Sequence, residues 1–107
     1  MTVREWVRTR EPRPPAALLD RLDAVLGDAL DHPVDGIATV LLTAGERLAA
    51  DLLGGERTSR ESALDLLTAD ALVTYAFEAA GATPGSIDVL AGDAMGRIAS
   101  LAAAGRR

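Results

Sequence analysis

Residues 58–81 contain the clearest helical signal in the sequence, and this segment most constrains how the chain can fold. Thr58 followed by Glu61 matches a capping box, in which the two side chains satisfy amide groups at a helix start. Gly81 is suited to end the same helix. Apolar residues occupy most of the circumference in between: Leu64, Leu66, Leu67, Ala71, Leu72, Val73, Tyr75, Ala76, Phe77 and Ala80. A helix that is apolar nearly all round is typical of the middle of a bundle, so we expect this one to be central.

A short helix is predicted at the N-terminus. Thr2 and Glu5 form another capping box, and the proline-rich segment 11–15 ends the helix, because proline disfavours helix in the residue before it. Pro15 then suits the first turn of a second helix, which we expect to reach about residue 30. Residues 31–33 interrupt the helical pattern before the next segment.

Two more helices follow from the spacing of apolar residues. One is expected over residues 34–53, where Gly54 and Gly55 would end it by adopting the left-handed conformation. The last begins with Thr83 as its cap and Pro84 in its first turn, and it ends near Gly105.

The composition agrees with a helical domain. Apolar residues make up 49% of the 107 residues but aromatic ones only 3%, and no segment alternates as a strand would. We predict an all-α fold: a single domain over 1–107, with an up-and-down-like bundle of four main helices over 15–107. The short N-terminal helix and the Pro-rich connector, residues 1–14, are expected as an appendage.

Charge and residue usage exclude several classes of function. The net charge is −5, which favours neither nucleic acid nor an anionic membrane surface as a partner. The chain has no cysteine and one histidine, so we assign no metal site, no cofactor and no catalytic residue. No targeting segment or membrane span is visible, and we expect a cytoplasmic protein.

A local cluster of arginines lies near the N-terminus, at positions 4, 8, 10 and 13. A phosphate-binding arm would need more stacking surface than Trp6 offers. We therefore expect these arginines to contact the acidic body of the protein, and we do not expect nucleic-acid binding. His32 lies between Asp31 and Pro33, which places it on a surface turn.

Asp70 is the polar residue with the strongest claim to a site. It shares a helix side with Leu66, and if that side faces the interior the carboxylate must pair with a cation or raise its pKa. Arg47 and Arg97 are its candidate partners. We favour a structural ion pair or an aspartate at the solvent edge of the stripe over a ligand-binding or catalytic acid.

Gly92 and Gly96 share one face of the last helix. Each interior glycine costs about 1 kcal/mol relative to alanine, so some contact should offset the loss. We expect a neighbouring backbone to approach them closely, either within the bundle or across a dimer; a ligand in the groove is the other possibility.

Residues 66–78, LLTADALVTYAFE, resemble the helix LLAGDALLTLAFELL of trans-prenyl diphosphate synthases. Upstream, Gly45-Glu46-Arg47-Leu48 is similar to the GKRLRP element that holds diphosphate in that family, although Glu46 replaces the lysine and the proline is missing. Both aspartate-rich magnesium motifs of the family are absent. The resemblance covers about a fifth of the chain, and we interpret it as convergence on a buried Ala/Leu helix.

The function that these patterns favour is a non-enzymatic interaction or assembly protein, a homodimer that buries apolar surface of its last two helices. The alternative is a small-ligand-binding or degenerate enzyme-like domain, with an apolar pocket near Asp70 and Arg47. Helical bundles host unrelated functions, so the fold does not decide between the two.

Overall fold

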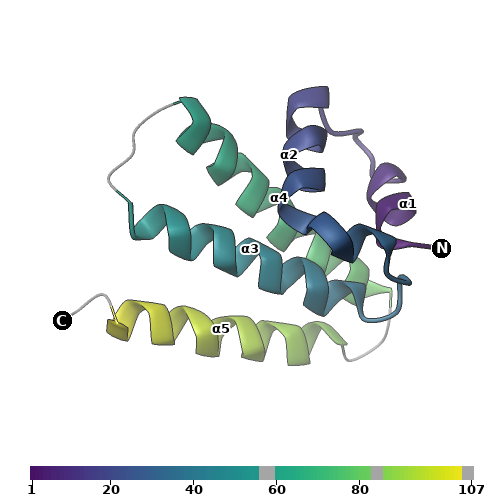
Figure 1. Ribbon diagram of the computed structural model, residues 1–107. Helices are drawn as coiled ribbons and strands as arrows, with labels where there is room; N and C mark the ends of the chain where they lie inside the picture. Colours follow the sequence, from purple (N-terminus) through teal and green to yellow (C-terminus); the bar gives the residue numbers. More distant parts are fainter. Residues whose placement is uncertain (56–59, 83–85, 105–107) are drawn as a thin grey trace.

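The computed structural model describes residues 1–55, 60–82 and 86–104, and its regular structure is helical (Figure 1). In chain order the elements are α1 (Val3–Arg8), α2 (Ala16–Leu26), the 3-10 helix η1 (Gly27–Asp31), α3 (Ile37–Leu53), α4 (Arg60–Gly81) and α5 (Ser86–Ala104). No strand occurs within those described ranges, where Thr2 and Pro33 form an isolated backbone bridge. The predicted all-α fold with four long helices is confirmed.

The helices α3 and α4 form the central pair and share by far the most extensive contact in the fold. Gly45 allows this contact, because a Cβ atom at this position would lie 3.1 Å from Val73 Cγ2 and 3.2 Å from Leu72 Cβ. The absence of a side chain on α3 therefore lets α4 approach closely. Close packing against a neighbouring helix was predicted for Gly92 and Gly96. Gly45, which does pack in this way, was not predicted from the sequence.

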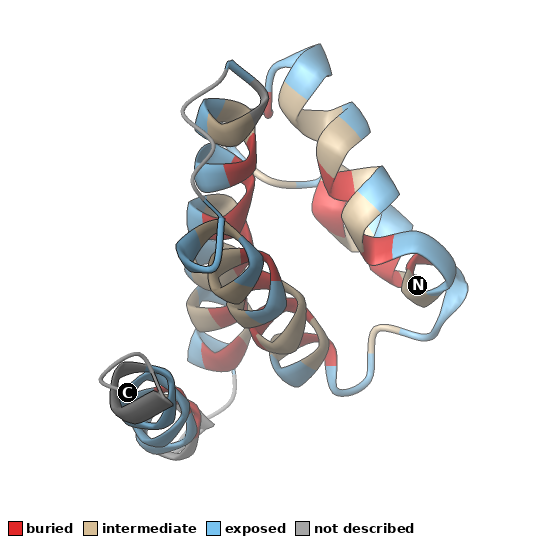
Figure 2. Ribbon diagram, turned by 60° about the vertical axis from the view of Figure 1, so that its left-hand side comes forward, coloured by how far each residue is buried: buried red, intermediate tan, exposed pale blue. Residues whose placement is uncertain are grey.

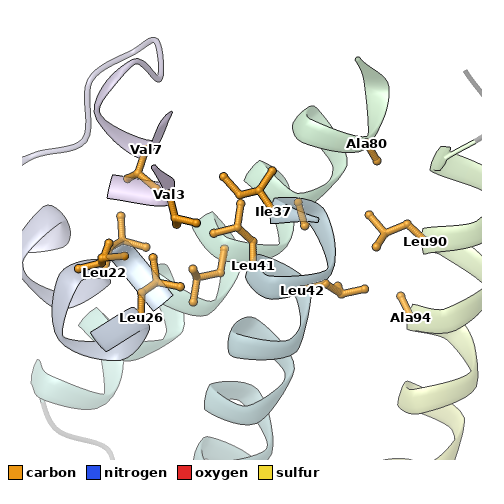
Figure 3. Close-up of a cluster of buried hydrophobic side chains, with 13 residues drawn as sticks. Val3, Val7, Leu22, Leu26, Ile37, Leu41, Leu42, Ala80, Leu90 and Ala94 are labelled. Atoms are coloured by element: carbon orange, nitrogen blue, oxygen red, sulfur yellow. The ribbon is translucent and has the colours of Figure 1, made fainter. Parts of the chain in front are cut away.

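Buried aliphatic side chains from all five α-helices, and from η1, form one core (Figure 3). Its members are Val3, Val7, Leu22, Leu26, Leu30, Ile37, Leu41, Leu42, Leu72, Ala76, Ala80, Leu90 and Ala94. Alanine predominates on the α4 and α5 sides. Short side chains keep these helices close to α3 and leave the larger leucines to fill the space near α2.

The N-terminal helix α1 is part of this core and not an appendage. Val3 and Val7 are fully buried, and Trp6 meets the edge of Tyr75 with ring centroids 6.2 Å apart. The backbone fastens the segment as well, since the Val3 amide donates to the His32 carbonyl at 3.0 Å. The Trp6–Tyr75 contact docks this helix against α4, while Val3 and Val7 join the common core.

The predicted capping box at the start of α1 is also present. Thr2 Oγ1 accepts from the Glu5 amide, and the Glu5 carboxylate accepts from the Thr2 amide at 3.2 Å. The Thr2 hydroxyl also donates to Glu5 Oε1 at 3.1 Å. Donation from the Thr2 amide and from this hydroxyl lowers the pKa of the Glu5 carboxylate. Two donors at the helix start are thereby satisfied.

Two glycines move helix boundaries from their predicted positions. Gly27 has φ +53°, so α2 stops at Leu26 and the chain continues as η1 in place of one helix to residue 30. Gly36 has φ +73°, so α3 begins at Ile37 and not at residue 34. Only glycine adopts these conformations without strain. At the other end α3 stops at Leu53 as predicted, but Gly54 caps it with a right-handed φ of −81°.

The predicted central place of α4 is confirmed, since this helix packs against α2, α3 and α5, but its apolar circumference is covered on one side only. One stripe of α4 is buried, comprising Thr68, Ala69, Leu72, Ala76 and Ala80. The opposite side faces solvent, where Leu66 is 64% exposed and Leu67 is 59% exposed. The chain has too few helices to surround α4, so it covers only the side that α2, α3 and α5 share. Gly81 does end α4 as predicted; the predicted caps Thr58, Thr83 and Pro84 lie outside the described residues.

Candidate functional site

The helix α5 is the least covered element of the fold. Among its residues whose burial is described, Leu90 and Ala94 in the first half are the ones that reach the core, and they face Ala80 and Leu42 in Figure 3. Every residue from Met95 to Leu101 is exposed. Figure 2 shows α5 set beside the other helices with most of its described surface open to solvent.

Two parallel strips run along the exposed side of α5. The first, which we call the ridge, is Ala91, Met95 and Ile98; Met95 is 72% exposed and Ile98 is 60% exposed. Beside it lies the trough, formed by Gly92, Gly96 and Ala99, all exposed. Helical spacing places each strip on one face, three or four residues between members. A protruding apolar strip thus lies next to a shallow one.

No neighbouring helix fills the trough. A Cβ atom on Gly92 or on Gly96 would have no heavy atom of another described helix within 4 Å. The expectation that a backbone of the same bundle approaches these glycines is therefore wrong. The other option, an approach across a dimer, stays a prediction.

Asp70, expected either in a structural ion pair or at the solvent edge of the apolar stripe, is exposed. It lies two residues from Leu72, which places it on roughly the opposite side of α4. Neither predicted partner pairs with it: Arg97 Nη1 donates to Glu46 Oε2 at 3.1 Å, and Arg47 has no ion pair within the described ranges. Asp70 is therefore an exposed aspartate outside the buried stripe. Of the two structural interpretations favoured from the sequence, the solvent-edge aspartate applies and the ion pair with Arg47 or Arg97 does not.

The buried carboxylate of α4 is Asp65, whose side chain is only 11% exposed. Its Oδ1 accepts a short hydrogen bond from Arg21 Nε on α2. Asp65 was not among the candidate site residues predicted from the sequence. The signal that could have identified it is its helical spacing. Asp65 precedes Ala69 by four residues and Leu72 by seven, and therefore lies on the same buried side of α4.

Replacing Asp65 with alanine should lower the free energy of unfolding by about 1 kcal/mol more than the Asp70→Ala substitution does. Both changes are made in the same helix, so the difference in helix propensity largely cancels. The measurement is urea denaturation followed by circular dichroism. Equal effects of the two substitutions would show that the Arg21–Asp65 pair contributes nothing to stability.

The N-terminal arginines contact the acidic body, as predicted. Arg4 pairs with Asp31, Arg8 Nη2 lies 2.9 Å from Asp23 Oδ2, and Arg10 Nη1 lies 3.2 Å from Glu78 Oε2. Arg10 also makes a cation–π contact, because its Cζ atom lies 3.6 Å from the centroid of the Trp6 ring. Most of the cluster is therefore engaged within the chain.

Two other residues complete the surroundings of this cluster. Burial raises the pKa of Tyr75, and the Glu78 carboxylate raises it further, whereas Arg10 opposes the shift. His32 is exposed in the turn after η1, as predicted.

Two hollows flank the outer face of α3. The α2–α3 cleft has a volume of about 630 Å³ and is lined by residues of α2, η1 and α3 and by His32. The α3–α5 groove has a volume of about 420 Å³ and includes Glu46, Arg97 and Leu101. Arg47 and Thr43 line both hollows, and Asp70 lines neither. Of the pair expected to line a pocket, Arg47 lines these two hollows and Asp70 does not.

Within the described ranges, no three histidine, aspartate, glutamate or cysteine side chains are grouped so that they could hold a metal ion. Among those same residues, no helix combines the length and the apolar character needed to cross a membrane.

No protein-family model, curated protein or solved structure matched this chain. The resemblance of residues 66–78 to prenyl diphosphate synthases thus depends on that segment and on residues 45–48. In this protein the two segments pack against each other, because Gly45 lies against Leu72 and Val73.

Proposed function

We propose that this protein is a non-enzymatic assembly protein that forms a homodimer through the ridge and trough of α5. The observation that carries the proposal is the juxtaposition of two features on one exposed helix face. Met95 and Ile98 protrude into solvent, and Gly92 and Gly96 beside them leave open space.

A second copy of the same chain is the occupant that this geometry fits best. In a dimer with two-fold symmetry the same surface is used twice, so it must be complementary to itself. The α5 face meets that condition, because the ridge of one copy can lie in the trough of the other. Ridge and trough contain no charged side chain, so their burial leaves no unpaired charge.

Association would also offset two costs that the single chain carries. Each interior glycine of α5 is less favourable than alanine by about 1 kcal/mol, and no contact within the described fold compensates for this. The exposed Met95 and Ile98 side chains would each contribute on the order of 1 kcal/mol or more when removed from water. Close packing of two α5 helices addresses both.

Ile98→Glu should convert a dimer into a monomer, because it places a charge in the centre of the contact. Gly96→Leu should do the same by filling the trough, and it should leave the single chain folded, since nothing lies within 4 Å of a Cβ atom there. The molecular mass is measured by light scattering during size-exclusion chromatography. The buffer contains about 150 mM salt, which screens the repulsion between two copies of net charge −5.

The matched control is Leu67→Glu, which adds the same charge to an exposed leucine on α4, outside the proposed contact. It should remain dimeric. A wild-type chain that stays monomeric at millimolar concentration would exclude the proposal. A dimer that is lost in Leu67→Glu but kept in Ile98→Glu would move the interface to α4.

A further inference from the structure

The α2–α3 cleft combines an apolar floor with a polar edge. Its apolar lining comes from α2, η1 and α3: Ala24, Val25, Leu26, Ala29, Val40, Ala44 and Leu48. Along α3, Thr39, Thr43, Arg47 and Asp51 also line the cleft, and their spacing of four residues forms one polar strip. Few precisely placed polar groups beside apolar surface are typical of small-molecule sites.

Arg47 is the cation in this strip that lacks a carboxylate partner among the residues described. The other arginine of the cleft, Arg21, is held by Asp65. An unpaired guanidinium beside apolar surface can form strong, charge-assisted hydrogen bonds to an anionic group.

Thr43 adds a hydroxyl one turn before Arg47. A hydroxyl in a helix can be occupied by bonding back to the preceding turn, as Thr68 Oγ1 does to the Leu64 carbonyl at 2.8 Å. The Thr43 hydroxyl makes no such bond to any residue in the described ranges, although Thr43 is half-buried. It therefore remains available to donate to a ligand.

We infer that the α2–α3 cleft binds a small monocarboxylate with an apolar body, whose carboxylate accepts from Arg47 and Thr43. Asp51 lies one turn beyond Arg47 and repels an anion, so the carboxylate sits on the Thr43 side. The apolar body then extends over Val40 toward Val25 on α2, which also line the cleft. A single unpaired cation next to an acidic residue suits one negative charge better than two.

Octanoate is a suitable probe, and octanamide is its neutral counterpart of equal length. Titration is followed by the amide resonances of the ¹⁵N-labelled protein, and we expect octanoate to shift those of Val40, Thr43 and Ala44. Loss of the charged contact in Arg47→Met should weaken octanoate binding roughly tenfold or more. The same substitution should leave octanamide binding nearly unchanged, because the methionine keeps the apolar stem.

Two further variants sharpen the test. Asp51→Asn should strengthen octanoate binding by about two- to fivefold, because it removes a nearby like charge. Arg13→Met is the matched control: Arg13 is exposed in the Pro-rich connector and does not line the cleft, so its loss should leave octanoate affinity unchanged.

Three results would overturn the inference. They are equal affinity for octanoate and octanamide, octanoate affinity that Arg47→Met does not change, and shifts that map to the exposed face of α5 in place of the cleft. The inference does not depend on dimer formation, since the cleft is built from α2, η1 and α3, and Ile98→Glu should bind octanoate like the wild type.

Discussion

Replacing Leu72 with alanine should lower the free energy of unfolding by about 2–5 kcal/mol, the range for a large-to-small change in a closed core. Leu72 is fully buried on α4, at the point where Gly45 brings α3 closest. The substitution removes transfer energy and leaves a cavity that a tightly packed helix pair closes only in part. Urea denaturation monitored by circular dichroism measures the loss.

The control for this experiment is Leu67→Ala on the same helix. Leu67 is 59% exposed, so its truncation should change the stability by no more than about 0.5 kcal/mol. If α4 were covered all round, the two substitutions would be similarly destabilising. The ratio of the two losses therefore measures directly which side of α4 faces the core.

Gly45→Leu should destabilise the fold by about 3 kcal/mol, the upper part of the usual range for overpacking. A Cβ atom at this position would already lie 3.1 Å from Val73 Cγ2, 3.2 Å from Leu72 Cβ and 3.3 Å from the Ala69 carbonyl oxygen. The remaining atoms of leucine cannot be placed without moving α3 and α4 apart. The midpoint of thermal unfolding should fall accordingly.

Ala63→Leu is the matched addition of bulk. Ala63 is exposed on α4, so a leucine there meets solvent and should leave the stability within about 0.5 kcal/mol of wild type. A Gly45→Leu protein as stable as the wild type would mean that the two central helices do not pack through Gly45.

The existence of the helices could be predicted from the sequence because their start and stop signals are local. Thr2 and Glu5 form the predicted capping box, and Gly81 ends α4, since these roles depend on neighbours within one turn. The positive φ of Gly27 and of Gly36 is a different matter. A glycine permits that conformation without requiring it, so helix boundaries shifted by several residues there.

The orientation of α4 and the charged contacts could not be predicted in the same way. When Leu, Val and Ala surround a helix, apolar spacing marks no unique buried side, and the packing of other helices decides between Leu67 and Leu72. The Arg21–Asp65 pair joins residues 44 positions apart in the sequence, and Arg97 pairs with Glu46, which lies 51 positions away. Such pairs depend on the tertiary fold, which explains why Asp70 was singled out in place of Asp65.

Part of the α1 region can complete its contacts only after the C-terminal end of α4 is in place. Arg10 bonds to Glu78 across a separation of 68 residues, and Trp6 meets Tyr75 in the same region. Closing a loop of this length costs more entropy than forming a turn of helix, so such contacts form late. The contacts of α1 with η1 and α2 involve residues nearer in sequence, such as the pair of Arg8 with Asp23, so they can form earlier. The side of α1 that faces α4 is therefore covered last, after the rest of this helix has found its place.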